Sequence, residues 1–200
     1  MNLDRAEAGL KLTRKIVDLE KSDLIVLSIP KGGVEFGLSL SDSLNAEFSL
    51  LIAKRIDSIF IDIPSLGAVA EDGSKLVFGH DGLTRSRFEE IIKDHVVEVN
   101  RRRKKLRPKL LPKLEGRTVV LVDDVAVTGS TLLVSVKMLR KLNVGEIIVA
   151  SMYVSKDIFK IVNERVENFI ALNILKDIEE TKKIHREMDE VSEEEILAMI

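Results

Sequence analysis

Apolar residues follow two different patterns along this chain. In some segments they form short continuous runs, which are typical of strands buried in a parallel sheet. In others they recur every three or four positions, which is typical of amphipathic helices. Over the first residues these patterns predict a helix, a strand, a helix and a strand, at residues 4–20, 23–29, 33–45 and 48–53.

The second half of the chain repeats this alternation more strictly. A long helix that includes Phe88 continues into the basic residues 101–107 and ends at Pro108. It is followed by a strand, a helix, a strand, a helix and a strand, at residues 118–122, 130–143, 146–154, 156–166 and 168–174. This order is the pattern of a parallel α/β sheet with helices on both faces. Ser192 and Glu195 form a capping box, which predicts a short final helix.

Residues 57–84 interrupt the alternation. A polar, proline-containing connection precedes two short extended pieces, 66–70 and 75–78, so we expect a hairpin or flap that carries a mobile loop. No internal repeat, low-complexity tract or linker divides the chain. We therefore expect a single α/β domain over residues 1–200, with its core at about residues 20–160.

The composition narrows the class of function. The content of 45% hydrophobic residues is enough for a sizeable core, and the net charge of −2 gives no general attraction to nucleic acid or membranes. Cysteine is absent and the three histidines have no ligand spacing, so neither a thiolate site nor a catalytic zinc site is favoured. No secretory signal and no apolar run of about 20 residues is present, so we expect a cytoplasmic protein.

The most informative stretch is VVLVDDVAVTGST at residues 119–131. In parallel sheets, ligands bind beyond the carboxyl ends of the strands, where helices begin. The free amides at the start of the next helix, together with the hydroxyls and the glycine of residues 128–131, suit a phosphate group. Asp123 and Asp124 would repel that phosphate, so they are expected to face the hydroxyls of a sugar, with Mg²⁺ offsetting the two like charges.

A second loop has similar chemistry. Lys31, Gly32 and Gly33 follow the first strand and open a helix, which makes them a second candidate anion site. Two anion sites that flank a site for hydroxyls indicate a sugar with a phosphate at each end.

Residues 119–131 resemble the phosphoribosyl pyrophosphate (PRPP) motif of type I phosphoribosyltransferases. That motif has four apolar residues, two acidic residues, four variable or small residues, and then Gly and Ser or Thr. Residues 66–73, the arginine-rich end of the long helix and residues 191–195 are also similar to an uncharacterised branch of predicted phosphoribosyltransferases. The resemblance implies a phosphoribosyltransferase-like fold with a flexible flap at about 57–84 and a small C-terminal hood at about 168–200.

The resemblance also implies roles for individual residues. Asp123 and Asp124 would hold the ribose hydroxyls and Mg²⁺, the metal directly or through water or PRPP. The residues implied to wrap the 5-phosphate are Ala126, Val127, Thr128, Gly129, Ser130 and Thr131. Those implied to bind the pyrophosphate are Pro30, Lys31, Gly32, Gly33, Lys54 and Arg55. The expected catalytic groups are Asp123, Asp124, Lys31, Lys54 and Arg55.

The implied reaction is Mg²⁺-dependent transfer of the 5-phosphoribosyl group from PRPP to a nitrogenous small molecule, with release of pyrophosphate. Mg²⁺ and the basic residues would stabilise the charge on the leaving group, and residues 57–84 would exclude water as a lid. Val127 stands where the family's 6-oxopurine enzymes carry an acidic residue, which disfavours 6-oxopurines. Residues 175–180 contain no aromatic side chain to stack on a base, so the acceptor stays open.

Other interpretations remain. The basic run from Arg101 to Lys113 suits a non-catalytic PRPP-sensing module that binds nucleic acid, although a run without aromatic residues is more often a solvated helix end or an oligomer contact. We expect a homo-oligomer, and a dimer in particular. A nucleotide triphosphatase would need the sequence GxxxxGK[ST], which is absent. In the simplest alternative, Asp124 only caps a turn and residues 128–131 only start a helix.

Overall fold

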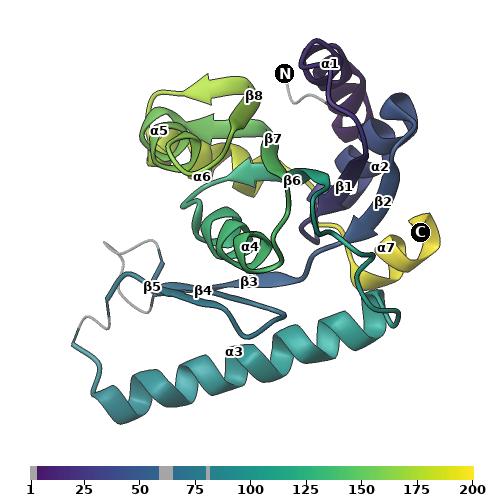
Figure 1. The fold of residues 1–200 in the computed structure, drawn as a ribbon. Helices are drawn as coiled ribbons and strands as arrows, with labels where there is room; N and C mark the ends of the chain where they lie inside the picture. Colours follow the sequence, from purple (N-terminus) through teal and green to yellow (C-terminus); the bar gives the residue numbers. More distant parts are fainter. Residues whose placement is uncertain (1–3, 59–64, 80–81) are drawn as a thin grey trace.

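The computed structural model describes residues 4–58, 65–79 and 82–200 (Figure 1). Its main element is a parallel five-stranded sheet with the strand order β2-β1-β6-β7-β8. The strands are β1 (Leu24–Ser28), β2 (Glu47–Leu50), β6 (Thr118–Ala126), β7 (Glu146–Ser155) and β8 (Asn168–Leu175). The predicted parallel α/β fold is confirmed.

Helices cover both faces of the parallel sheet, as predicted. They are α1 (Arg5–Val17), α2 (Gly33–Leu44), α4 (Ser130–Lys141), α5 (Lys156–Asn163) and α6 (Ile178–Glu187). Along β6, Val119 and Leu121 pack with α4 and α5. Val120 and Val122 pack with α1 and α2 on the other face, because successive side chains of a strand alternate. No helix within the described ranges is both long and apolar enough to cross a membrane.

A second, antiparallel sheet contains β3 (Ala53–Ile56), β4 (Gly67–Ala70) and β5 (Lys75–Val77). It lies between α4 and the long helix α3 (Arg85–Leu106), which runs along the bottom of Figure 1. The β4–β5 pairing confirms the predicted hairpin. The mobile loop predicted within residues 57–84 falls in part on residues 59–64 and 80–81, which lie outside the described residues.

The single strand predicted at 48–53 is wrong, because the chain changes sheets there. β2 ends at Leu50 in the parallel sheet, and β3 begins at Ala53 in the antiparallel one. Between them, the Ile52 amide donates to Glu71 Oε1 at 3.0 Å, and the Glu71 amide donates to the Ile52 carbonyl at 3.0 Å. Because of these contacts with a residue distant in the sequence, one continuous apolar run is divided between two sheets.

Two further differences concern the site. The strand predicted at 118–122 continues to Ala126, because Asp123, Val125 and Ala126 each pair with a residue of β7. The segment after β8 contains α6, a helix that the sequence did not predict, and its N-cap Asp177 accepts from the Glu180 amide. Both additions place structure at the edge of the sheet where a ligand was expected.

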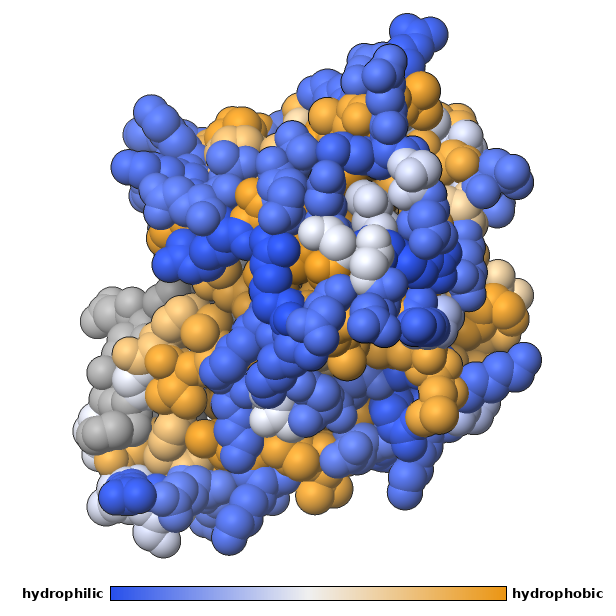
Figure 2. All heavy atoms as spheres, viewed as in Figure 1, coloured by the Kyte–Doolittle hydropathy of each residue, from blue (hydrophilic) through white to orange (hydrophobic). Residues whose placement is uncertain are grey.

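Figure 2 shows that polar side chains cover most of one face of the molecule, while apolar side chains gather at its left edge, beside the residues drawn in grey. Strand β5 and the residue after it have exposed apolar side chains. Val77 is 45% exposed and Phe78 is 54% exposed. This apolar edge lies away from the polar contacts described next.

The final helix α7 (Glu193–Met199) begins with the predicted capping box of Ser192 and Glu195. It is fastened to the basic end of α3 by ion pairs. Arg101 Nη2 lies 2.5 Å from Glu193 Oε1, and Lys105 Nζ lies 3.0 Å from Glu193 Oε2. The first part of the basic run is therefore occupied by acidic groups of the same chain.

These ion pairs predict how the docking of α7 depends on pH. Hydrogen bonds with Arg101 lower the pKa of Glu193 to about 2. A lowered carboxyl pKa contributes stability that is present above about pH 4.5 and lost as the pH falls toward 2. We expect Glu193→Gln to lower the thermal midpoint at pH 7, and the difference from wild type to shrink between pH 4.5 and 2.

Calorimetric unfolding scans at several pH values measure this difference. The exposed Glu164, which lies at the end of α5, provides the matched control variant Glu164→Gln, with no expected effect. If the difference in thermal midpoint between wild type and Glu193→Gln stays constant down to pH 2, the ion pairs of Glu193 are not the source of this stability.

Candidate active site

A cavity of about 600 Å³ lies at the carboxyl ends of β1 and β6, beside β3 and the segment that follows α6. It brings together most of the predicted site residues. Those that line it are Pro30, Lys31, Gly32, Lys54, Arg55, Asp123, Asp124, Val127, Thr128, Gly129 and Thr131. Gly33, Ala126 and Ser130 are buried next to it and do not line it. Among the described residues, no Phe, Tyr or Trp side chain lines the cavity.

The two aspartates of the motif have different surroundings. Because β6 continues through them, their side chains leave the strand on opposite faces. Asp123 Oδ2 accepts from Thr131 Oγ1 of α4 at 3.2 Å. Asp124 Oδ2 accepts from Nε and Nη2 of Arg5, on α1, at 3.1 and 3.0 Å. The two aspartates of β6 therefore contact different helices, Asp123 contacting α4 and Asp124 contacting α1. The sequence did not predict this difference.

Burial and the nearby charge of Asp124 raise the pKa of Asp123 well above its usual value. Thr131 and Arg55 act in the opposite direction with smaller effects. Asp124 is 8% exposed, and its Oδ1 accepts from the Val125 amide at 2.9 Å. By accessible surface, Asp123 is half-buried and Asp124 is buried, and among the described residues only Asp124 has an ion pair with a cation, which is Arg5.

The loop after β1 contacts the acidic pair directly. The peptide bond between Pro30 and Lys31 is cis. A Cβ atom added to Gly32 would lie 1.8 Å from Asp124 Oδ2, so only glycine allows the backbone to approach this carboxylate so closely. The two loops that the sequence placed at separate strands are thus packed against each other.

This contact predicts the effect of Gly32→Ala. The added methyl group must displace the Asp124 carboxylate, and overpacking of this kind typically costs about 1–3 kcal/mol of unfolding free energy. Denaturant unfolding measures the loss. Combining it with Asp124→Ala removes the clash, so the double variant should lose less stability than the sum of the two single changes. Strict additivity would show that the close approach has no energetic consequence.

The three predicted cations, Lys31 after β1 and Lys54 and Arg55 of β3, line the same cavity. Lys31 Nζ lies 3.9 Å from Glu190 Oε2, and Arg55 Nε lies 2.6 Å from Asp57 Oδ1. No carboxylate of the described residues lies within 4.0 Å of Lys54 Nζ. Burial, followed by the nearby charge of Arg102, lowers the pKa of Lys54. Of the three predicted cations, Lys54 is therefore the one without an ion pair among the described residues.

The connection from β6 to α4 has the features expected of an anion loop. Gly129 has a φ of 66°, a left-handed conformation that glycine adopts without strain, and it caps the start of α4. Thr128 Oγ1 and Ser130 Oγ lie 2.9 Å apart and fix each other. The Ser130 amide donates to Thr128 Oγ1 at 3.4 Å, while the next amides of the first turn have no partner within the helix and are available to an anion.

Several lining residues were not predicted. They include Arg5 of α1, Arg102 of α3, and His185, Arg186, Met188, Asp189, Glu190 and Val191 after or at the end of α6. No spacing in the sequence relates residue 5 to residue 124, since tertiary packing alone brings α1 to β6. Met188, by contrast, continues the apolar spacing of α6, so its position on the buried face could have been predicted from the sequence.

Comparison with known proteins identifies the family of this chain. The family model of the phosphoribosyl transferase domain matches residues 75–192. Two curated proteins provisionally named phosphoribosyl transferases, from Mycobacterium tuberculosis strains CDC 1551 / Oshkosh and ATCC 25618 / H37Rv, are each 26% identical over 155 residues. The match covers 74% of this chain and 34% of each relative, so the chain spans about a third of their length.

The crystal structure of TT1426 from Thermus thermophilus has the same fold. Its TM-score is 0.79, with 23% sequence identity over 98% of this chain and 95% of that chain. The family match covers more than half of the present chain and confirms the resemblance carried by residues 119–131. The chain belongs to the phosphoribosyl transferase domain family.

Proposed function

We propose that the protein is a Mg²⁺-dependent phosphoribosyltransferase that transfers the 5-phosphoribosyl group of PRPP to a nitrogenous acceptor and releases pyrophosphate. The observation that carries this proposal is that one cavity holds the acidic pair, the loop at the start of α4, and the predicted cations Lys31, Lys54 and Arg55. Membership of the family supports a transferase. PRPP as the ligand, Mg²⁺ as the metal and a nitrogenous acceptor are proposals that go beyond family membership.

Each part of the site suits one part of PRPP. Thr128, Gly129 and the first amides of α4 suit the 5-phosphate. Asp123 suits the ribose hydroxyls, because a carboxylate accepts from hydroxyl donors. Lys54 and the loop around Lys31 suit the pyrophosphate.

In the transfer, the acceptor nitrogen forms a bond to the anomeric carbon while the carbon–oxygen bond to pyrophosphate breaks. The pyrophosphate leaves with the electron pair, and the acceptor's proton passes to solvent. Lys31, Lys54 and Arg55 stabilise the charge that grows on the leaving group.

The residues present could hold Mg²⁺ only together with a bound ligand that supplies further oxygen atoms. Among the described residues, no group of three or more His, Cys, Asp or Glu side chains can hold a metal ion. Mg²⁺ commonly keeps several waters and takes one or two carboxylates together with substrate phosphates. Asp123 would supply such a carboxylate, while Asp124 is engaged by Arg5. When bound, Mg²⁺ supplies further charge neutralisation on the pyrophosphate.

Two measurements test the proposal. Calorimetry with PRPP and Mg²⁺ should show binding, and a screen of nitrogenous bases and amines should give pyrophosphate release with at least one acceptor. Lys54→Met should weaken PRPP binding by roughly tenfold, which corresponds to the loss of one charged contact. Lys93→Met on the exposed side of α3 is the matched control and should leave binding unchanged.

The absence of PRPP binding would refute the proposal. Binding without pyrophosphate release from any acceptor, together with an effect of PRPP on nucleic-acid affinity, would support the non-catalytic sensing module instead. The ion pairs of Arg101 and Lys105 with Glu193 do not favour that module, because they occupy part of the basic run it would use.

A further inference from the structure

Arg5 is the most strongly engaged cation at the cavity, and none of the preceding roles uses it. Its side chain is 11% exposed. Nε and Nη2 both donate to Asp124 Oδ2, and Nη2 also donates to the carbonyl oxygen of Asp189 at 2.9 Å. One guanidinium thus connects the start of α1, the acidic pair and the segment after α6.

These contacts use most of the hydrogen-bonding capacity of Asp124. Each carboxylate oxygen accepts about two hydrogen bonds. Oδ2 receives both from Arg5, and Oδ1 receives one from the Val125 amide. With Gly32 packed against the same carboxylate, Asp124 is held by the protein rather than left for a ligand. Arg5 also compensates one of two adjacent negative charges, which would otherwise repel a phosphorylated ligand.

Residues 188–191, which we call the clasp segment, join α6 to α7 along the cavity. Their two ends are fixed by apolar contacts, because Met188 packs with the cluster of α1 and α2, and Val191 packs with the cluster of α3. Their middle is fixed by polar contacts alone, from Arg5 to the Asp189 carbonyl and from Lys31 to Glu190. The Lys31 contact is 3.9 Å long and involves a Glu190 side chain that is 93% exposed, so Arg5 makes the stronger of the two.

We propose that Arg5 is a positioning residue of this site, which holds the Asp124 carboxylate in place and fastens the clasp segment along the cavity. Its effect on the ligand rests on the proposed function, because it acts there through Asp124. Its effect on the clasp segment does not, because the contact is present in the protein alone.

Proteolysis of the free protein tests the fastening. A glutamate-specific protease cleaves after Glu190 within the clasp segment, and after the exposed Glu115, which is remote from it and serves as an internal reference. Arg5→Met should raise the rate of cleavage after Glu190 by roughly tenfold relative to Glu115, because local opening becomes easier. Arg14→Met, on an exposed position of the same helix, is the matched control and should leave the ratio unchanged.

Calorimetry with PRPP and Mg²⁺ tests the effect on the ligand. Arg5→Met should weaken binding by roughly tenfold, since Asp124 loses its counter-charge. Arg5→Lys keeps the charge but lacks the planar fork, so it should restore binding to within roughly threefold of wild type while cleavage after Glu190 stays fast. A purely structural role would not separate these two readouts.

The possible outcomes are distinct. If the cleavage ratio is unchanged in Arg5→Met, or rises equally in Arg14→Met, the fastening role is wrong. If PRPP binds wild type and Arg5→Met equally well, the role through Asp124 is wrong. If wild type does not bind PRPP at all, the proposed function fails, and the proteolysis result still decides whether Arg5 fastens the clasp segment.

Discussion

Replacing both carboxylates of the acidic pair, Asp123→Asn with Asp124→Asn, is expected to weaken PRPP binding by at least about a hundredfold. Each amide keeps the size of the side chain but removes a negative charge. Asp123 then loses its proposed charge-assisted contacts with the ribose hydroxyls and Mg²⁺, and Asp124 loses its ion pair with Arg5. Calorimetry with PRPP and Mg²⁺ measures the effect, and circular dichroism shows whether the fold is retained.

The single variants separate the two aspartates. Asp123→Asn should account for most of the loss, because Asp123 is the carboxylate that the structure leaves open to the ligand. Asp124→Asn should have the smaller effect, because the Asp124 carboxylate is held by Arg5 and the Val125 amide rather than left for the ligand. Asp42→Asn on the exposed side of α2 is the control and should change nothing. Equal effects of the two single variants would show that the pair is not divided in the way its contacts indicate.

Breaking the ion pair between Glu71 and Arg107 is expected to have the largest effect on stability. The two side chains are 5% and 9% exposed, and burial raises the pKa of Glu71 and lowers that of Arg107. These directions mean that burial costs more than the pairing returns, so the pair adds little net stability while either charge alone is very unfavourable. Arg107→Met should therefore lower the unfolding free energy by about 3–5 kcal/mol.

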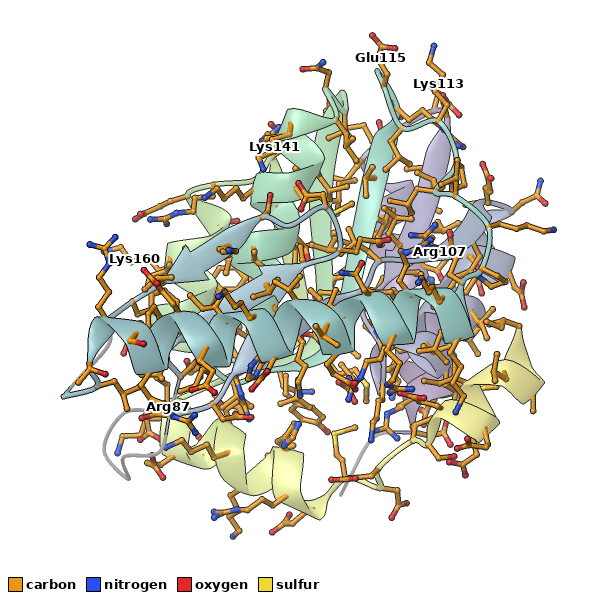
Figure 3. All side chains as sticks on the ribbon, turned by 90° about the horizontal axis from the view of Figure 1, so that it is seen from below. Arg87, Arg107, Lys113, Glu115, Lys141 and Lys160 are labelled. Carbon is orange, nitrogen blue, oxygen red and sulfur yellow. The ribbon has the colours of Figure 1, made fainter. Side chains whose placement is uncertain are left out.

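Urea unfolding of three variants tests this prediction. Arg107→Met combined with Glu71→Gln should be more stable than Arg107→Met alone, because no charge is left buried without a partner. The control is the exposed pair of Lys113 and Glu115, which lies on the loop beyond Arg107 in Figure 3. Lys113→Met should cost no more than about 1 kcal/mol. A double variant less stable than Arg107→Met would overturn the argument from burial.

The sequence predicted the helices and strands that depend on local periodicity. α1, α2, α4 and the strands β1 and β7 lie close to the expected positions because their apolar spacing is continuous. The division of residues 48–53 between two sheets was not predicted, because it depends on hydrogen bonds between Ile52 and Glu71, which are nineteen positions apart. A local pattern contains no information about such a contact.

The same distinction applies to the site. The loop around Lys31 was predicted because a cation and two glycines are adjacent in the sequence, and residues 128–131 were predicted because hydroxyl residues flank a glycine. The separation of Asp123 from Asp124 was not, because it follows from the extra length of β6, which is set by pairing with β7. Arg5 was missed for a similar reason, since its partners come only from packing of α1.

The contacts of Arg5 also bear on the order in which the site forms during synthesis. Arg5 reaches one partner 119 positions away and another 184 positions away. Because the ribosome releases the chain from its N-terminus, Arg5 and Asp124 are both available well before Asp189. The contact that compensates Asp124 therefore does not require the clasp segment, and the contact of Arg5 with the Asp189 carbonyl is the last of the two that can form.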